Sequence, residues 1–241
     1  MTGKVKGKPE IMLALDGMSI DDAILLAKKL SGLGAIFKVN DLLDTDYGLK
    51  IIPMLSEFGL VVADAKYHDI PDTVDRRVAK CASYKPFAIT IHASGGIAMM
   101  RAAVKSAGES KIMAVTVLTS ISEEVSNINF GAPTKAKVLQ YAREAVLAGV
   151  HGIVCSVKEL NFLAHKDYSE THGLIKMTPG IRPPDLTVKN DDQARTGNIV
   201  DAITSDYLVI GRPITKANDP VEAFKTIQQQ IDEAWKIKLE G

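Results

Sequence analysis

Short apolar runs alternate with longer amphipathic segments along almost the whole chain. The runs are rich in Val, Ile, Leu and Ala, and most of them end at a polar or charged residue. Continuous apolar runs bounded by turn residues are typical of buried parallel strands. We therefore expect eight strands, in the runs Glu10–Leu15, Ala35–Val39, Leu60–Lys66, Pro86–His92, Lys111–Leu118, Val150–Cys155, Leu174–Met177 and Tyr207–Ile210.

The segments between these runs carry the start and stop signals of helices. Ser19 precedes two acidic residues, as a capping residue does, and Pro71 suits the first position of a helix. Gly149 follows an amphipathic segment and is expected to end it. The predicted helices are Ser19–Leu30, Asp46–Phe58, one starting at Pro71, one ending at Lys105, Thr134–Ala148, Val157–His165, Gly197–Ile203 and Pro220–Lys236.

Eight strands that alternate with eight helical segments indicate a closed parallel (β/α)8 barrel, the α/β fold known as the TIM barrel. A chain of 241 residues has a normal length for such a barrel. No linker and no low-complexity tract interrupts the pattern. We therefore expect a single barrel domain over residues 1–241, with residues 1–9 as a disordered tail.

The run that begins at Leu60 is unusual because charged residues enter it. Side chains alternate between the two faces of a strand, so Val62, Asp64 and Lys66 share one face. If that face lies inside the barrel, a carboxylate and an ammonium group lie together where water is scarce. Charges are costly to bury unless they are paired, so this pattern indicates either a functional site or a structural ion pair at the end of the strand.

In (β/α)8 barrels the active site lies at the carboxyl ends of the strands, where the βα loops meet. The lysines at these ends would face acidic residues across the barrel mouth, and a lysine beside a carboxylate should stay protonated and able to donate a proton. The polar residues that end the predicted strands are Asp16, Lys38, Asp64, Lys66, His92, Thr119, Gly180, Arg182, Gly211 and Arg212.

The loops after the seventh and eighth strands are the usual phosphate sites of such barrels. In this chain they contain Gly180, Gly211 and Arg212. Arg182 and Gln193 lie on a connection long enough to act as a lid. The barrel interpretation alone thus predicts an enzyme that acts on a small phosphorylated substrate.

Other interpretations stay open for some of these residues. Asp16 precedes Gly17 and is also a common turn former. The side chain of Lys38 could point away from the barrel interior. His92 fits a hydrogen-bonded histidine of the core or rim better than a catalytic base.

Composition narrows the class of protein. Twenty-nine basic and 29 acidic residues give a formal net charge of zero, which argues against nucleic acid or an anionic membrane surface as a partner. No apolar run has the length of a membrane span, and the first ten residues lack the apolar region of a signal peptide, so we expect a cytoplasmic protein. Cys81 and Cys155 lack metal-binding or redox spacing and are interpreted as core thiols.

The segment D-A-K-Y-H-D-I-P-D-T-V, residues Asp64–Val74, resembles the D-x-K-x-x-D-I-P-x-T-V signature of the orotidine 5'-phosphate decarboxylase family. Further motifs occur in the family's order and extend the resemblance from Met12 to Trp235. They are L-A-L-D at 13–16, F-K-V at 37–39, T-V-L-T-S at 116–120, T-P-G-I-R-P at 178–183, D-D-Q-x-R at 191–195 and V-I-G-R-P-I-T at 209–215.

This resemblance implies that the substrate is orotidine 5'-monophosphate (OMP) and the product UMP, made in de novo pyrimidine biosynthesis without a cofactor or metal. It implies a charged tetrad of Lys38, Asp64, Lys66 and Asp69, in which Lys66 stabilises and protonates a carbanion at C6 of the pyrimidine. The implied substrate-binding residues are Asp16 and Lys38 for the ribose, Thr119 and Ser120 near the pyrimidine, and Arg182, Gln193, Gly211 and Arg212 for the phosphate.

The resemblance also implies a homodimer with shared active sites. Asp69, together with Ile70 and Thr73, would reach into the site of the partner subunit. The segment 64–74 would then serve two sites, because Asp64 and Lys66 would act in their own subunit.

Two other functions are compatible with part of this pattern. A related barrel enzyme of the 3-hexulose-6-phosphate synthase type shares the D-x-K-x-x-D core, but it holds an enediolate on Mg²⁺ and needs a further acidic ligand. Ile70-Pro71 and the T-V-L-T-S run match the nucleotide enzyme better. A catalytically silent barrel that binds nucleotides or a protein is the other alternative, and the complete set of acids and lysines argues against it.

Overall fold

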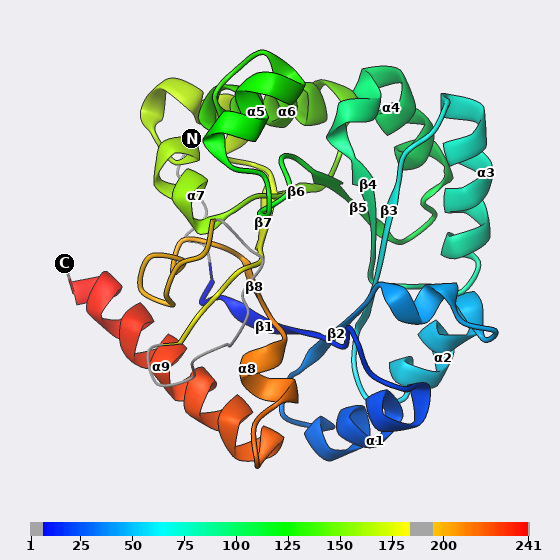
Figure 1. The fold of residues 1–241 in the computed structure, drawn as a ribbon, viewed down its shortest axis with the longest axis vertical. Coiled ribbons are helices and arrows are strands. Elements are labelled where there is room, and N and C mark those ends of the chain that lie inside the picture. Colours follow the sequence, from blue (N-terminus) through cyan, green and yellow to red (C-terminus); the bar gives the residue numbers. More distant parts are fainter. Residues whose placement is uncertain (1–6, 184–194, 241) are drawn as a thin grey trace.

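The computed structural model describes residues 7–183 and 195–240. Eight parallel strands form a closed barrel in sequence order, and β1 closes it by pairing with β8 (Figure 1). This confirms the predicted (β/α)8 architecture. The strands are β1 (Glu10–Ala14), β2 (Ile36–Val39), β3 (Val61–Tyr67), β4 (Ala88–His92), β5 (Lys111–Val115), β6 (Gly152–Val154), β7 (Ile175–Thr178) and β8 (Tyr207–Ile210).

Helices surround the barrel as an outer ring (Figure 1). The α-helices are α1 (Ile20–Leu30), α2 (Ile51–Ser56), α3 (Pro71–Ala82), α4 (Gly96–Ser106), α5 (Glu123–Phe130), α6 (Thr134–Ala148), α7 (Val157–Leu163), α8 (Arg212–Thr215) and α9 (Pro220–Glu240). Short 3-10 helices are η1 (Asp41–Asp44), η2 (Gly48–Lys50), η3 (Ala93–Gly95) and η4 (Lys166–Thr171). None of the helices in residues 7–183 and 195–240 combines the length and the apolar character that a membrane span requires.

Several predicted helix boundaries have the expected local cause. The Ser19 hydroxyl accepts a hydrogen bond from the Asp22 N–H at the start of α1, and Pro71 is the first residue of α3. Gly149 ends α6 in the left-handed conformation, at a φ of 76°. In α7, Ser156 and Glu159 cap each other reciprocally, which satisfies two backbone donors at the helix start.

The side chains of the strands form two separate apolar layers. The larger layer packs the outer face of the strands against the helices. The smaller layer fills the barrel interior, and its members are Met12, Ala14, Ile36, Val62, Ala88, Met113, Met177 and Val209. Val62 in this layer confirms that the face it shares with Asp64 points into the barrel.

The helices depart from prediction at four places. Residues 199–204 form hydrogen-bonded turns rather than the predicted helix over 197–203, because the N–H groups of Ala202 and Ile203 donate to carbonyl groups three residues back. Gly197 instead pairs with Ile181 in an isolated bridge. The second helix begins at Ile51 instead of Asp46, after two short 3-10 helices. Helices α5 and α8 were not predicted; α5 starts at the capping residue Ser122 and ends at a left-handed Gly131.

The beginning of the chain also differs in part from the expectation of a tail over residues 1–9. Residues 1–6 lie outside the described part of the chain. Pro9 is buried, and the Lys8 ammonium group pairs with Asp232 of α9. The described structure thus already contacts the last helix before β1 begins.

Candidate active site

A cavity of about 740 Å³ opens at the carboxyl ends of the strands. Its floor is apolar and includes Ala14, Val115, Val154, Met177 and Val209. Its polar lining consists of Asp16, Lys38, Asn40, Asp64, Lys66, Thr119, Ser120, Arg182 and Arg212, together with the backbone of Gly17, Gly180 and Gly211. The cavity therefore has the position, size and mixed lining of a site for a small polar molecule.

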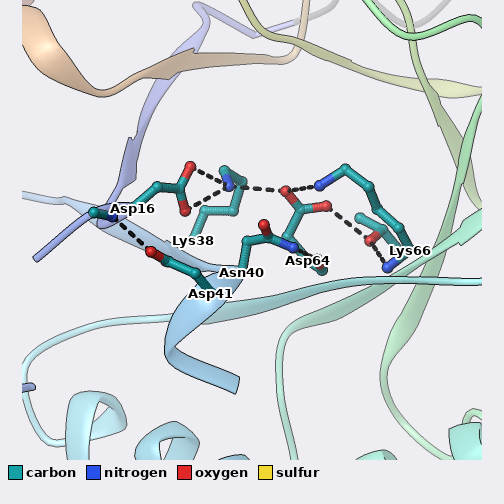
Figure 2. Close-up of polar contacts among 8 residues, drawn as sticks. Asp16, Lys38, Asn40, Asp41, Asp64 and Lys66 are labelled. Carbon is teal, nitrogen blue, oxygen red and sulfur yellow. Dashed lines mark hydrogen bonds and ion pairs between the residues drawn. The ribbon is translucent and has the colours of Figure 1, made fainter. Parts of the chain in front are cut away.

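Four charged residues form a continuous chain across this cavity (Figure 2). Lys38 Nζ lies 3.0 Å from Asp16 Oδ2 and 2.8 Å from Asp64 Oδ2. Lys66 Nζ lies 2.7 Å from the same Asp64 oxygen. The register explains the arrangement, since Lys38 pairs with Val62 and Asp64 lies two residues farther along β3 on the same face. The side chain of Lys38 therefore points inward, and the alternative that it faces outward is wrong.

The two central groups of this chain stabilise each other's charged forms. Burial alone would raise the pKa of Asp64, but the ammonium groups of Lys38 and Lys66 outweigh it and hold that pKa well below its usual range. Burial alone would lower the pKa of Lys38, but the carboxylates of Asp64 and Asp16 outweigh it and raise that pKa above its usual value. The site therefore keeps a buried carboxylate between two cations.

Lys66 has an unusual backbone conformation, with a φ of +46°. This left-handed region costs a residue with a Cβ roughly 1–2 kcal/mol. The strain coincides with an irregularity in the pairing of β3 with β4. Ala63 of β3 pairs with Ile89 of β4, but Tyr67, four residues farther along β3, pairs with Ile91, only two residues farther along β4. Such strain at a candidate catalytic lysine is typical of functional sites, where the surrounding structure holds a conformation that a regular strand would not adopt.

Two residues that sequence reasoning missed also shape this part of the site. The Asn40 amide donates to the Asp64 carbonyl oxygen at 2.7 Å, and the Asn40 side chain lines the cavity. Asp41 accepts from the Gly17 N–H at 2.8 Å, which fixes the turn that carries Asp16. Both follow directly after β2, so their place at the carboxyl end of a strand was the signal that could have found them.

The opposite side of the cavity carries the predicted phosphate-binding residues. Gly180, Arg182, Gly211 and Arg212 all line it, as expected for the loops after β7 and β8. The Arg182 N–H donates to Gly197 O at 2.8 Å, which joins the strand-seven loop to the segment before β8. Gln193, the remaining predicted phosphate ligand, lies outside the described residues.

Thr119 and Ser120 line the cavity from the loop after β5. A buried ion pair supports this loop: Arg195 Nη1 lies 2.7 Å from Glu159 Oε1, and Arg195 Nη2 donates to Val117 O and Leu118 O. The Arg195 backbone N–H donates to Thr119 O at 3.1 Å. Arg195 thus connects α7, the β5 loop and the segment that precedes β8.

The three residues predicted to serve a partner subunit do not line this cavity. Asp69 Oδ2 lies 3.5 Å from Arg77 Nη1, and Asp69 Oδ1 accepts from the Ile70 N–H. Ile70 is 65% exposed, and Thr73 is partly exposed. The structure therefore brings Asp16, Lys38, Asp64 and Lys66 together but leaves Asp69, Ile70 and Thr73 outside the site of their own chain.

The cysteines are buried as predicted, and His92 lies at the rim of the barrel. His92 is half-buried at the end of β4 with its ring 5.6 Å from that of His68, and burial, followed by the nearby His68 and Lys66, lowers its pKa. Both Cys81 and Cys155 are buried free thiols. Cys155 in addition lines the cavity, and burial raises its pKa to about 12, so it is a protonated, weakly polar part of the lining.

Comparison with known proteins gives a consistent result. Residues 9–227 match the model of the orotidine 5'-phosphate decarboxylase / HUMPS family. The chain is 38% identical over 229 residues to the orotidine 5'-phosphate decarboxylase of Dichelobacter nodosus, covering 92% of this chain and 98% of that one. It is 35% identical over 233 residues to the enzyme of the same name from Tolumonas auensis, covering 93% and 99%.

Solved structures are similar over the same length. Orotidine 5'-phosphate decarboxylase from Lactobacillus acidophilus aligns with a TM-score of 0.76 at 30% identity, covering 95% of this chain and 99% of that one. Orotidine 5'-monophosphate decarboxylase from Methanocaldococcus jannaschii, solved in complex with the inhibitor BMP, aligns with a TM-score of 0.75 at 23% identity, covering 93% and 99%. The second likeness concerns the fold alone.

Proposed function

Since the chain belongs to the orotidine 5'-phosphate decarboxylase / HUMPS family, we propose that it converts OMP into UMP and CO₂ with its own side chains as the only catalytic groups. Decarboxylation of OMP, a step of pyrimidine biosynthesis, is the activity of the curated relatives that match it over almost their full length. That metabolic role supports a cytoplasmic location. The observation that carries the mechanism is the position of Lys66 Nζ in the cavity, 2.7 Å from Asp64 Oδ2.

The reaction needs a fixed positive charge at C6 of the pyrimidine. When the bond between C6 and the carboxylate carbon breaks, CO₂ leaves and the electron pair stays on C6, where no ring position delocalises it. The Lys66 ammonium group stabilises this carbanion and then transfers a proton from Nζ to C6, which gives UMP. Lys66 afterwards recovers a proton from water.

Asp64 and Lys38 prepare Lys66 for this role. Asp64 keeps Lys66 in place and would lie beside the substrate carboxylate, so that repulsion between the two carboxylates is relieved as CO₂ departs. Lys38 offsets the cost of keeping Asp64 ionised in a buried position, as the depressed pKa of Asp64 indicates.

The remaining cavity residues divide into three binding regions. Asp16 and Lys38 bind the ribose hydroxyls, and Thr119 and Ser120 contact the pyrimidine. Arg182, Gln193, Gly211 and Arg212 bind the phosphate. The lining of the cavity by all of these except Gln193 supports the assignment. Binding energy from the distant phosphate orients the ring at Lys66.

The active enzyme is a single-domain homodimer in which Asp69, Ile70 and Thr73 complete the site of the partner subunit. Their exclusion from their own cavity and the exposure of Ile70 support this arrangement, because an isolated chain gives these residues no role in its own site. In the dimer, Asp69 would become the fourth member of the charged tetrad.

The proposed function is tested by adding OMP to the purified protein and following the pyrimidine absorbance, with UMP identified as the product. We expect turnover that is unaffected by EDTA and absent in the Lys66→Ala variant. Loss of activity with EDTA, restored by Mg²⁺, would contradict the cofactor-free mechanism. Tight UMP binding without any turnover of OMP would instead indicate a catalytically silent nucleotide-binding barrel.

A further inference from the structure

Thr90 lies in the middle of β4, next to the charged chain but outside the cavity. Its side chain is fully buried, and it does not belong to the cavity lining. It has no part in the proposed binding of substrate or in the proposed proton transfer. Its hydroxyl nevertheless forms hydrogen bonds from β4 to both Asp64 and Lys66 of β3.

The Thr90 hydroxyl makes two hydrogen bonds whose directions are fixed by chemistry. It accepts from the Lys66 backbone N–H at 2.9 Å and lies 2.8 Å from Asp64 Oδ1. A backbone N–H can only donate and an ionised carboxylate can only accept, so the single hydroxyl proton of Thr90 goes to Asp64. Both oxygens of Asp64 are then occupied. Thr90 binds Oδ1, and the two lysines bind Oδ2, as Figure 2 shows.

The irregular pairing of β3 with β4 explains why a side chain is needed at this place. β3 advances from residue 63 to 67 while β4 advances only from 89 to 91, so a regular ladder is impossible between them. Lys66 has its positive φ within this interval. The Thr90 hydroxyl supplies the acceptor that a regular strand would have offered to the Lys66 N–H.

We propose that Thr90 is a positioning residue that fixes the Asp64 carboxylate and the strained Lys66 backbone in their catalytic arrangement. This inference rests on the proposed function, since it assigns Lys66 to proton transfer. Without the hydroxyl, Asp64 Oδ1 loses its hydrogen-bond donor and only the two lysines at Oδ2 orient the carboxylate. The Lys66 backbone N–H also loses its buried acceptor. The ribose and phosphate contacts come from other strands and stay in place.

The test compares Thr90→Val and Thr90→Ser with the control Thr116→Val. Thr116 is also a buried barrel threonine, and its hydroxyl donates to Val154 O at 2.7 Å without contacting the charged chain. We expect Thr90→Val to lower kcat by about 10- to 100-fold, the range for lost positioning contacts, with KM for OMP changed by less than about threefold. Thr90→Ser keeps the hydroxyl, so its kcat should stay within about threefold of the wild-type value. Thr116→Val should leave kcat unchanged.

A second measurement does not depend on catalysis. Amide hydrogen exchange at Lys66 should become at least about tenfold faster in Thr90→Val but not in Thr116→Val, because only the former removes the acceptor of that N–H. If Thr90→Val does not fold, Thr90→Ala removes the same hydroxyl without adding a methyl group and carries the same expectation.

The proposal is overturned if Thr90→Val keeps its kcat, if Thr90→Ser is as impaired as Thr90→Val, or if Thr116→Val loses as much. Failure of the proposed function has a different signature, which is a wild-type protein that does not turn over OMP. In that case the exchange rate at Lys66 still decides whether Thr90 fixes this backbone.

Discussion

Lys66 Nζ lies 2.7 Å from Asp64 Oδ2, the same oxygen that Lys38 Nζ approaches to 2.8 Å. A single carboxylate oxygen thus receives two ammonium groups from neighbouring strands. Two cations this close would repel each other without the carboxylate between them. Lys66 is therefore held by a balance of charges as well as by its own strand.

Replacing Lys66 should separate catalysis from binding. In Lys66→Met the proton donor and the positive charge at C6 are lost, so kcat should fall by at least about 10⁴-fold. Affinity for UMP, measured by calorimetry, should change by less than about tenfold, because the phosphate and ribose contacts remain. Lys80→Met, on the exposed face of α3, is the matched control and should behave like the wild type. A comparable loss of UMP binding in Lys66→Met would argue against its role in the chemical step.

Mixing two inactive variants should restore part of the activity if the sites are shared. Lys66→Ala damages the site of its own subunit, and Asp69→Ala damages that of the partner. A mixed dimer then holds one doubly damaged and one intact site, so after complete subunit exchange about a quarter of the wild-type activity is expected, since half of the dimers are mixed and each has one working site of two. Exchange is confirmed by native mass spectrometry. Confirmed exchange without recovered activity would refute shared sites.

The charge network predicts a specific pH dependence of stability. The pKa of Asp64 is depressed in the folded state, so its contribution is complete above the unfolded value of about 3.9 and is lost as the pH falls below it. The raised pKa of Lys38 has the opposite effect on stability. The contribution of Lys38 to the free energy of unfolding is complete below its unfolded pKa of about 10.4 and is lost at higher pH.

Urea unfolding at pH 6 and pH 3 measures the acidic part of this dependence. The free energy of unfolding of the wild type should fall by about 1 kcal/mol more than that of Asp64→Asn over this interval. The reason is that the unfolded wild-type chain binds a proton at residue 64 that the folded protein, with its depressed Asp64 pKa, does not bind. Equal losses in the two proteins would mean that Asp64 is not stabilised as an anion.

Breaking the buried Arg195–Glu159 pair should destabilise the protein far more than breaking an exposed pair. Arg195→Met leaves the Glu159 carboxylate buried without its partner and should lower the free energy of unfolding by about 3–5 kcal/mol. The control is Arg143→Met, which removes an exposed pair with Glu170 and should destabilise the protein far less, because solvent screens that pair. Both are measured by urea unfolding, and similar losses would contradict the structural role of Arg195.

Sequence reasoning identified the barrel and the charged residues at its mouth for a simple physical reason. Period-two alternation and strand ends are local properties, so the sequence alone assigns Val62 and Asp64 to one face of their strand. The helices were less predictable where contacts distant in sequence compete for the backbone, as at Gly197, which pairs with Ile181 instead of starting the predicted helix.

The contacts between strands could not be predicted in the same way. Thr90 and Asn40 act on Asp64 through the register of neighbouring strands, and that register is irregular beside Lys66. Nothing local in the sequence indicates how many residues of β3 oppose β4. The assignment of Asp69 to a partner site likewise depends on a second chain, which one sequence does not position.

The left-handed backbone at Lys66 limits how far the D-A-K segment can be transplanted. The letters D-A-K fit any inward-facing strand end, but in a regular parallel ladder Lys66 would have a negative φ and a different exit direction for its side chain. Grafting this tripeptide onto another barrel should therefore fail unless the two-residue slippage against the next strand is grafted with it. A design must therefore copy a pair of mismatched strands together with the tripeptide.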